Sequence, residues 1–543
     1  MSEVIELGSA DIVPEPSSPW LQAIDRWAER IGDRLNPILV KEARQALKSR
    51  RFFATFSALL LMSWLISLVG LAMTGPNIVF GQYGPQFFIA YFGFLAFALL
   101  VIVPYGAFRS LAVEQEERTY ELLSITAMNP RQIVAGKLGS AIVQMFIYLS
   151  AISPCLAFTY LLRGIDLPTM LFVLGWTVLL SIGLSAIGLL LGTLALRRTM
   201  QALVSVGAII GLMWGFIGAM ALASTVLFEE AMPFEDLWFW QLNGGLFTAY
   251  LSTFALVFYA AVAQITFAFD NRSSRLRACM MVQYLSAAAW AGWAWFGPAK
   301  ADAALLWAFT IASGIYWFVM GSMMTGEQPE LSLRVRRGLP QSFMGRMFLT
   351  WFNPGPGTGY VFAISGCLTT LLLVLAAYPQ AQSRPWARGE DLLTFAVVGL
   401  CYVVIYLGVG LLLLRLVRRK FRADAFGGAM IQIVLILFGC AMPALAQELV
   451  PGLRFQGYSL MQVTNFAWTL AELADGRLPN YVSTLLVLLP VAAVLLFVLN
   501  LPGIARELRR VRVTAPVRVL EEDAQLAALV SPPAPPAKES PWD

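Results

Sequence analysis

Four acidic residues crowd a short polar interval of the sequence. Glu114, Glu116, Glu117 and Glu121 occur within eight positions, and Arg118 follows Glu114 by four, the spacing of a favourable helical ion pair. Carboxylates at this density can bind a basic surface or take part in acid–base chemistry. The chain contains no histidine, the commonest acid–base catalyst and metal ligand, which argues against a hydrolytic site.

The acidic interval lies between two long apolar stretches and is predicted to be helical. Leu111, Leu122 and Ile125 fall roughly on one stripe, so the segment has one polar and one apolar face. This pattern predicts a helix over 111–127, within the interval 109–137, lying across the cytoplasmic mouth of a membrane domain.

Two Asn-Pro pairs predict the starts of further helices. Asn129 can cap a helix that begins at Pro130, with Gln132 at the capping-box position. Asn36-Pro37 gives the same signal before a basic amphipathic stretch over 37–51. A simple basic anchor for the first span explains the charges of that stretch equally well.

The composition is that of an integral membrane protein. Of 543 residues, 58% are hydrophobic and only 13% are charged, against about a quarter in soluble proteins. Nothing in the net charge of +5 indicates nucleic-acid binding, and no cleavable signal peptide is visible. The five cysteines fall in apolar segments without C-x-x-C spacing, which predicts packed thiols and no metal site.

Hydropathy predicts an all-α bundle of about twelve spans, arranged as six plus six, because a bilayer core needs about 20 apolar residues per helix. Basic residues collect in alternate loops, which predicts cytoplasmic termini at both ends and a position in the cytoplasmic (inner) membrane. The predicted spans are 52–73, 87–108, 138–162, 168–196, 201–228, 247–269, 279–297, 303–325, 359–378, 392–415, 426–447 and 482–505.

The predicted domains follow from these spans. They are interfacial helices over 1–51, a six-span domain over 52–277, a second six-span domain over 278–512, and a disordered Pro-rich cytosolic tail over 513–543. The segment 460–474, in a long outer loop, is predicted to be a surface helix that places Phe466 and Trp468 at the membrane interface.

The central portions of the predicted spans contain no Asp, Glu, Lys, Arg or His. A proton-coupled pump is difficult to build without a titratable group in its path, although sodium coupling through carbonyls and hydroxyls remains open. The sequence also lacks a G-x-x-x-x-G-K-[ST] phosphate-binding loop. The chain is therefore not expected to hydrolyse ATP itself.

The motif E-x-E-E-R-T-x-E-L-L at 114–123, followed by Asn-Pro-Arg at 129–131 and Ile-Val-x-Gly-Lys at 133–137, resembles the coupling loop of type 2 ABC transporter permeases. These are the membrane-spanning subunits of exporters driven by a separate ATPase. The chain departs from the family at Arg118, where a glycine is usual. The resemblance covers roughly the first 270 residues, and the second half matches only in character.

The resemblance implies an ABC ATPase subunit in trans that carries ATP and Mg, with no cofactor in this chain. The elbow helix of the family corresponds to 37–51. Contact with the ATPase is implied for the coupling residues Glu114, Glu116, Glu117, Arg118, Glu121 and Leu122. In the family the first and fifth spans meet at the transmembrane dimer interface, which assigns the strip Gly207, Gly211 and Gly215 to that interface, with packing inside one bundle as the alternative.

Two other functions stay open at this stage. One is a scaffold or assembly subunit of an envelope complex that carries nothing itself. The other is a membrane-embedded transferase, for which Glu229, Glu230, Glu235 and Asp236 form the only dense acidic group predicted outside the cytoplasm. The transported substrate, and whether the chain pairs with itself or with a second permease, do not follow from the sequence.

Overall fold

A computed structural model describes residues 36–75, 81–116, 129–194, 198–228, 232–267, 269–297, 303–340, 342–382, 389–421, 425–449, 458–478, 480–510 and 516–530. These residues form helices and loops, with no strand among them. Eleven of the helices are long and apolar enough to cross a membrane. The chain is therefore an all-α, multi-pass membrane protein, as the composition predicts.

The predicted count of twelve spans stays a prediction. The seventh predicted span, 279–297, coincides with helix α11 (Ser274–Phe296), which is not among the eleven. Contacts divide the chain into two units. Unit 1 holds Met1–Phe239 and Val257–Ile265, and unit 2 holds Trp240–Leu256 and Thr266–Asp543, so the division passes through α10 (Leu237–Ile265).

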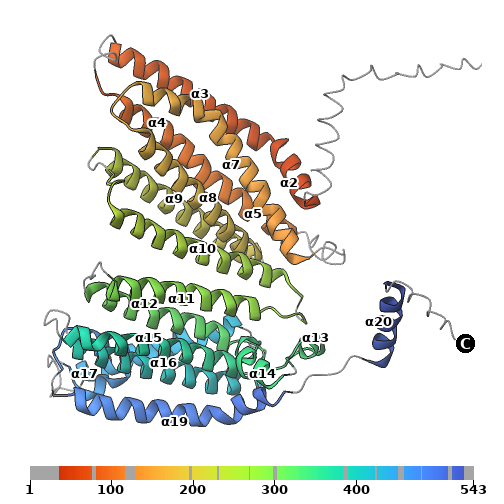
Figure 1. The fold of residues 1–543 in the computed structure, drawn as a ribbon, viewed down its shortest axis with the longest axis vertical. Helices are drawn as coiled ribbons and strands as arrows, with labels where there is room; N and C mark the ends of the chain where they lie inside the picture. Colours follow the sequence, from red (N-terminus) through yellow and green to blue (C-terminus); the bar gives the residue numbers. More distant parts are fainter. Residues whose placement is uncertain are drawn as a thin grey trace, which may run out of the picture. The chain divides into compact units, whose positions relative to one another are not determined.

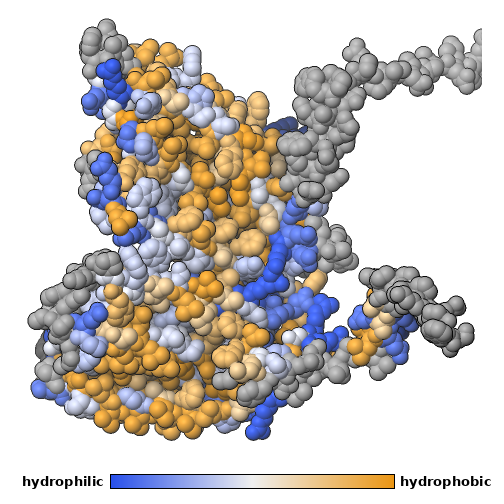
Figure 2. Space-filling model, in the orientation of Figure 1, coloured by the Kyte–Doolittle hydropathy of each residue, from blue (hydrophilic) through white to orange (hydrophobic). Residues whose placement is uncertain are grey.

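Unit 1 is a bundle of long helices with one short helix at its start (Figure 1). Figure 2 shows hydrophobic side chains over the flanks of the spans, as a membrane protein requires. Together with the two ends of α10, its elements are α2 (Pro37–Leu47), α3 (Arg50–Thr74), α4 (Gly84–Phe97), the π-helix η2 (Ala98–Ile102), α5 (Val103–Glu116), α7 (Pro130–Leu161), α8 (Leu167–Leu194) and α9 (Arg198–Phe228).

The first two helices of unit 1 begin at side-chain caps. Asn36 Oδ1 accepts a hydrogen bond from the Ile38 N–H at 3.0 Å, which confirms the predicted start at Pro37. The helix ends earlier than predicted, at Leu47, because Ser49 caps a new helix by accepting the Phe52 N–H at 3.1 Å. The basic residues at 50 and 51 therefore begin the first span and do not belong to the elbow helix.

A single helical rod over Gly84–Glu116 contains a π-helical turn. Pro104, just after this turn, has no N–H to donate to the preceding turn, and such a gap is tolerated in a membrane helix where another group satisfies the backbone. Ser181 of α8 donates from Oγ to the carbonyl oxygen of Leu99 at 2.6 Å, inside the π-helix. The serine thus satisfies a carbonyl within the irregular turn.

Helices α5 and α8 approach each other closely at two glycines. A Cβ at Gly188 would lie 2.6 Å from the carbonyl oxygen of Pro104, and one at Gly192 would lie 2.8 Å from that of Phe108. Only residues without side chains permit this backbone contact. The contact holds α5 against α8 from Pro104 to Ala112.

Unit 2 is built around α16, which packs against four other long helices of the unit. Its elements are α11, α12 (Ala303–Thr325), α13 (Leu333–Arg337), α14 (Phe343–Leu349), the 3-10 helix η3 (Thr350–Phe352), α15 (Pro356–Gln382), α16 (Gly389–Val417), α17 (Ala425–Leu449), the 3-10 helix η5 (Leu460–Thr464), α18 (Phe466–Ala474), α19 (Val482–Leu508) and α20 (Val517–Val530).

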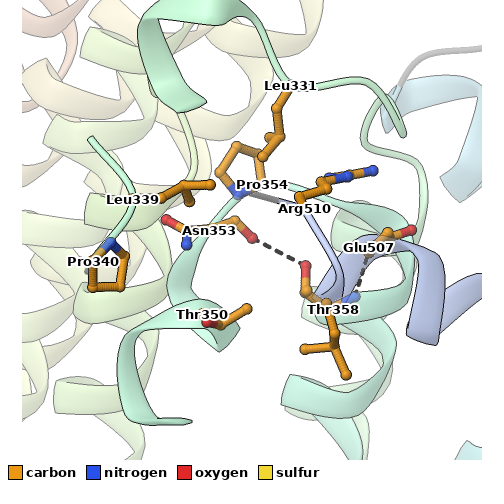
Figure 3. A pocket seen from close by; sticks show the side chains of 10 residues that line it. Leu331, Leu339, Pro340, Thr350, Asn353, Pro354, Thr358, Glu507 and Arg510 are labelled. Carbon is orange, nitrogen blue, oxygen red and sulfur yellow. Dashed lines mark hydrogen bonds between the residues drawn. The ribbon is translucent and has the colours of Figure 1, made fainter. Parts of the chain in front are cut away.

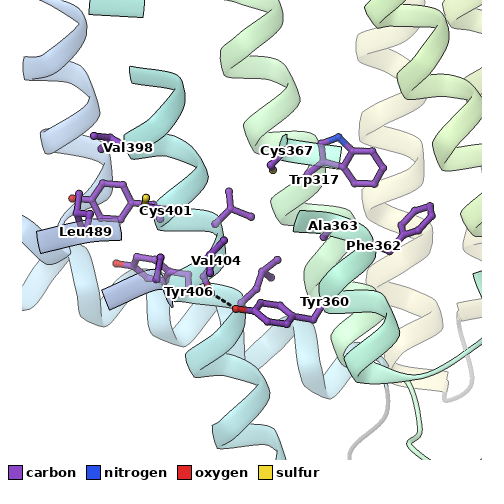
Figure 4. Packing of buried hydrophobic residues seen from close by; sticks show 14 of the residues in the cluster. Trp317, Tyr360, Phe362, Ala363, Cys367, Val398, Cys401, Val404, Tyr406 and Leu489 are labelled. Carbon is purple, nitrogen blue, oxygen red and sulfur yellow. Dashed lines mark hydrogen bonds between the residues drawn. The ribbon is translucent and has the colours of Figure 1, made fainter. Parts of the chain in front are cut away.

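The core of unit 2 is aromatic (Figure 4). Trp317 of α12 is fully buried, and a Cβ at Gly366 of α15 would lie 2.0 Å from its ring, so the glycine makes room for the indole. Tyr360 is also fully buried, and its hydroxyl donates to the carbonyl oxygen of Val404 at 2.9 Å. The phenol therefore joins α15 to α16 inside the membrane domain.

The predicted surface helix over 460–474 is wrong in two respects. The segment breaks at Asn465 into η5 and α18, and the ring of Phe466 packs 5.6 Å from that of Tyr406 in the core of unit 2. Gln462 is fully buried and donates to Gln447 Oε1 at 2.8 Å. The buried polar residues supply hydrogen bonds within the protein that the hydropathy pattern does not reveal.

The predicted tail over 513–543 contains a helix. Helix α20 covers Val517–Val530, where Arg518 and Glu522 form an ion pair one turn apart at 3.3 Å. The composition of the whole tail, which is rich in proline after residue 530, obscured this Pro-free stretch. Residues 531–543 lie outside the described residues.

Candidate functional site

The predicted lateral helix over 111–127 is only partly described. Residues up to Glu116 continue the rod of α5, so the first turns of the predicted helix belong to the span itself. The physical reason is burial, since Leu111 and Ala112 are 1% and 0% exposed against Gly192 of α8. The remaining coupling residues Glu117, Arg118, Glu121 and Leu122 lie outside the described residues.

A buried lysine lies beside the last turns of α5. Lys137, in the second turn of α7, has a side chain only 1% exposed, and its ammonium contacts two carboxylates. Its Nζ donates to Glu114 Oε1 at 2.8 Å, to Glu42 Oε1 at 3.2 Å and to the carbonyl oxygen of Ser110 at 3.1 Å. These three contacts use every donor of the ammonium group.

We refer to Lys137, Glu42 and Glu114 as the Lys137 cluster. A buried ammonium is costly unless it is paired and hydrogen-bonded, and here the pairing comes from two other helices. Glu42 lies on α2 and Glu114 on α5, while Lys137 lies on α7. The cluster therefore joins α2 to both helices that flank residues 117–128.

The local sequence brings these three helices together. Gln132 Oε1 accepts the N–H of Asn129 at 3.1 Å, so α7 begins where the capping pattern predicts. The amide of Asn36 donates to the carbonyl oxygen of Gln132, which ties the cap of α2 to the first turn of α7. A Cβ at Gly136 would lie 2.8 Å from the side chain of Ile38, so a glycine is needed for α2 to lie against α7.

The sequence placed Lys137 inside a motif but gave it no role, and Glu42 was not singled out. One signal was present, because Lys137 is a lone cation several positions inside an apolar helix, where a charge needs a partner. The identity of that partner could not be predicted, since Glu42 is 95 residues away in sequence. Of the two predicted coupling residues that the structure describes, Glu114 joins the cluster and Glu116 is exposed at the end of α5.

Unit 2 holds a second buried cation, Arg277 at the start of α11. Its side chain is fully buried, and Nη2 donates to Glu327 Oε2 at 2.6 Å and to the carbonyl oxygen of Gly355 at 3.0 Å. Its Nη1 donates to the carbonyl oxygen of Trp351 at 2.6 Å and to Thr358 Oγ1 at 3.1 Å. The guanidinium thus fixes the loop that leads into α15.

Glu507 of α19 holds the first turn of α15. Its carboxylate accepts the Gly357 N–H at 3.0 Å and the Thr358 N–H at 3.1 Å, a favourable position for an anion at a helix N-terminus. Figure 3 shows Glu507 and Thr358 beside Asn353 and Arg510, which all line one small pocket. Burial lowers the pKa of Arg510, while neighbouring Glu507 raises it.

The glycine strip of α9 is open. A Cβ at Gly207 or Gly211 would meet no atom of the described residues within 4 Å, and one at Gly215 would meet only Leu184 at 3.7 Å. The neighbouring Trp214 is 71% exposed. Gly207 and Gly211 thus make no close packing contact with the described residues, whereas Gly215 packs against Leu184 of α8; the interface and the packing inside one bundle both stay predictions.

The candidate groups for other chemistry are sparse. Among the described residues no three His, Cys, Asp or Glu side chains are grouped closely enough to hold a metal ion. Of the acids predicted to lie outside the cytoplasm, Glu235 and Asp236 are exposed, and Asp236 accepts a hydrogen bond from the indole of Trp238 at 3.1 Å. Glu229 and Glu230 lie outside the described residues.

Comparisons of the chain with known protein families, with curated proteins and with solved structures found no match. What the chain does must therefore be inferred from its own residues. The two buried cation clusters are the most specific polar features that the structure describes, and each lies at one end of a long helix.

Proposed function

We infer that the chain is the permease subunit of an ABC-type exporter in the cytoplasmic (inner) membrane. In this proposal a separate ATPase subunit binds ATP and Mg and hydrolyses ATP. Its conformational change reaches the spans through the segment 109–137, and the membrane domain alternates its access between the two faces. Both termini are proposed to be cytoplasmic.

The distribution of charge supports an external energy source. In the described long helices the ionisable Asp, Glu, Lys and Arg residues lie near helix ends, as Glu114, Lys137, Arg277 and Glu507 do. A charge in the middle of a span costs about 2.5–3.5 kcal/mol on insertion scales and marks ion pathways where it occurs. Spans without such groups fit a transporter that is moved from outside the bilayer.

The observation that carries the proposal is the Lys137 cluster. A push on residues 117–128 reaches α5 at Glu116 and α7 at Asn129, and the buried ammonium couples both helices to α2. Because buried ion pairs are costly to break, the three helices are expected to move together. The acidic segment 117–128 is attached to the two helices that this cluster joins. It could therefore bind a basic groove of the ATPase and transmit the movement of the ATPase to the spans.

Co-purification tests the proposal directly. The chain, extracted in mild detergent, should retain an ATPase subunit, and the double variant Glu117→Lys/Glu121→Lys should release it because two attractive charges become repulsive. Retention of the ATPase at the wild-type level would contradict the coupling role of 109–137. The exposed pair Arg419→Glu/Lys420→Glu is a matched double charge reversal that should leave retention unchanged.

Transport in vesicles distinguishes a permease from a scaffold. Reconstituted with its ATPase, the chain should move a substrate only when ATP is hydrolysed. A complex that hydrolyses ATP without moving any substrate, and that still assembles with other envelope proteins, would favour the scaffold.

A further inference from the structure

Helix α20 is amphipathic, and its described side chains are all exposed to solvent. Leu520, Ala524 and Ala527 recur at spacings of four and three, so they share one face. Every described side chain over 518–527 is exposed, and Leu520 is 53% exposed. A helix with one apolar face normally buries that face against another surface.

A basic and apolar surface lies on α13 and α14 of the same unit. We define the α13–α14 surface by its exposed apolar side chains Leu333, Met344 and Phe348 and by the arginines of α13. Leu333 is 61% exposed and Met344 is 64% exposed. Arg334 is exposed and forms an ion pair with Asp270 at 2.8 Å, whereas Arg336 and Arg337 are half-buried. Apolar and basic groups are thus mixed on two short helices joined by five residues, 338–342.

The chain tethers α20 near this surface. Arg510 donates to the carbonyl oxygen of Pro329, and Leu339, Pro340 and Leu508 line the same small pocket. Six residues separate Arg510 from Val517 in sequence. The seven Cα–Cα steps from Arg510 to Val517 span at most about 25 Å, so α20 starts within reach of α13 and is present at a high effective concentration.

The charges of the two surfaces are complementary. α20 carries Glu521, Glu522 and Asp523 against the single Arg518, a net charge of −2 (1 − 3). An acidic helix is repelled by a membrane surface of anionic lipid, which attracts basic segments instead. The α13–α14 surface combines positive charge with exposed apolar side chains. It could therefore contact both the carboxylates and the apolar face of α20.

We propose that α20 docks on the α13–α14 surface of its own chain, with the face of Leu520, Ala524 and Ala527 against the exposed apolar side chains and its carboxylates beside the arginines of α13. Docking covers the loop that leads from α12 to α15. Because the helix has only 14 residues and few large apolar side chains, its binding is weak and depends on the short tether.

Cysteine cross-linking in the full-length chain tests the docked face. Ala524→Cys with Met344→Cys should be joined by a short bismaleimide several-fold more efficiently than Gln525→Cys with Met344→Cys. Residue 525 is turned about 100° away from residue 524, while the tether is the same. The single variants show any reaction with the five native cysteines. Equal yields for the two pairs would mean that α20 samples all orientations, which overturns the proposal.

Charge exchange tests the electrostatic part. Arg336→Glu/Arg337→Glu should lower the yield of the Ala524→Cys/Met344→Cys pair several-fold, and Glu521→Lys/Asp523→Lys should restore it. The exposed pair Arg419→Glu/Lys420→Glu, which lies outside the α13–α14 surface, should have no effect. A cross-link between two chains would assign the surface to a second copy of the chain. A cross-link that disappears in vesicles with anionic lipid, but not in neutral ones, would assign the surface to lipid. Either outcome would contradict the proposal. Cross-linking needs no ATPase and no transport, so its outcome is independent of the proposed function.

Discussion

At the scale of single residues, both units contain a buried cation that is paired with a carboxylate. Lys137 and Arg277 are both buried cations near the N-terminus of a long helix, and each contacts a carboxylate from another element. Lys137 donates its three hydrogen bonds to two carboxylates and one carbonyl oxygen. Arg277 instead donates from both terminal nitrogens, to Glu327 and to the loop before α15. A cation in such a place stabilises the fold only while its partners remain.

The first prediction concerns Lys137→Met. The substitution leaves Glu42 and Glu114 facing each other, both less than a fifth exposed, and removal of one member of a buried ion cluster costs on the order of 3 kcal/mol. We expect a clear fall in the thermal unfolding midpoint in detergent. Lys137→Arg should lower the midpoint less than Lys137→Met does, because arginine keeps the positive charge.

Two controls accompany this measurement. Lys41→Met removes an exposed ammonium from α2, the helix that carries Glu42, and should leave the midpoint unchanged. Adding Glu42→Gln and Glu114→Gln to Lys137→Met should recover part of the loss, because the carboxylates no longer repel each other. No recovery would mean that Lys137 acts through its packing and not through its charge.

At the scale of elements, the sequence predicted what depends on near neighbours. The starts of α2 and α7 follow from caps that involve residues two or three positions apart, such as Asn36 with Ile38. The partners of Lys137, and the serine that satisfies Leu99, are 23 to 95 residues away, so no local pattern identifies them. For the same reason the segment 460–474 was expected at the surface, although Gln462 is fully buried and Phe466 contacts the core.

The element-scale prediction uses two glycines with opposite surroundings. Gly188→Ala places a Cβ 2.6 Å from a backbone oxygen of α5, so the helices must separate and the unfolding midpoint should fall. Gly211→Ala meets open space and should be neutral or stabilising, because alanine favours a helix over glycine by about 1 kcal/mol. The comparison is a thermal unfolding series in one detergent. A loss at Gly211 equal to that at Gly188 would show that the strip of α9 is already packed.

At the scale of the whole molecule, the number of spans decides the sides of the termini. Eleven spans place the two ends of the chain on opposite sides of the membrane, and a twelfth brings them to the same side. The doubtful element is α11, whose 23 residues are about 35 Å long, enough for a hydrocarbon core of about 30 Å. Its charges, Arg275 and Arg277, lie in its first turn, and its remaining residues contain no ionisable Asp, Glu, Lys or Arg. These features favour a crossing.

We therefore predict that both termini lie on the cytoplasmic side. Ser2→Cys and Ser540→Cys should both react with a membrane-impermeant maleimide in inside-out vesicles, and neither should react in right-side-out vesicles. Glu235→Cys, in a predicted outer loop, should show the reverse. The wild-type chain measures the reaction of the native cysteines. Labelling of the two ends from opposite sides would remove α11 from the spans. It would also move either segment 109–137 or the α13–α14 surface out of the cytoplasm, because α5 and α12 lie on either side of α11 in the chain.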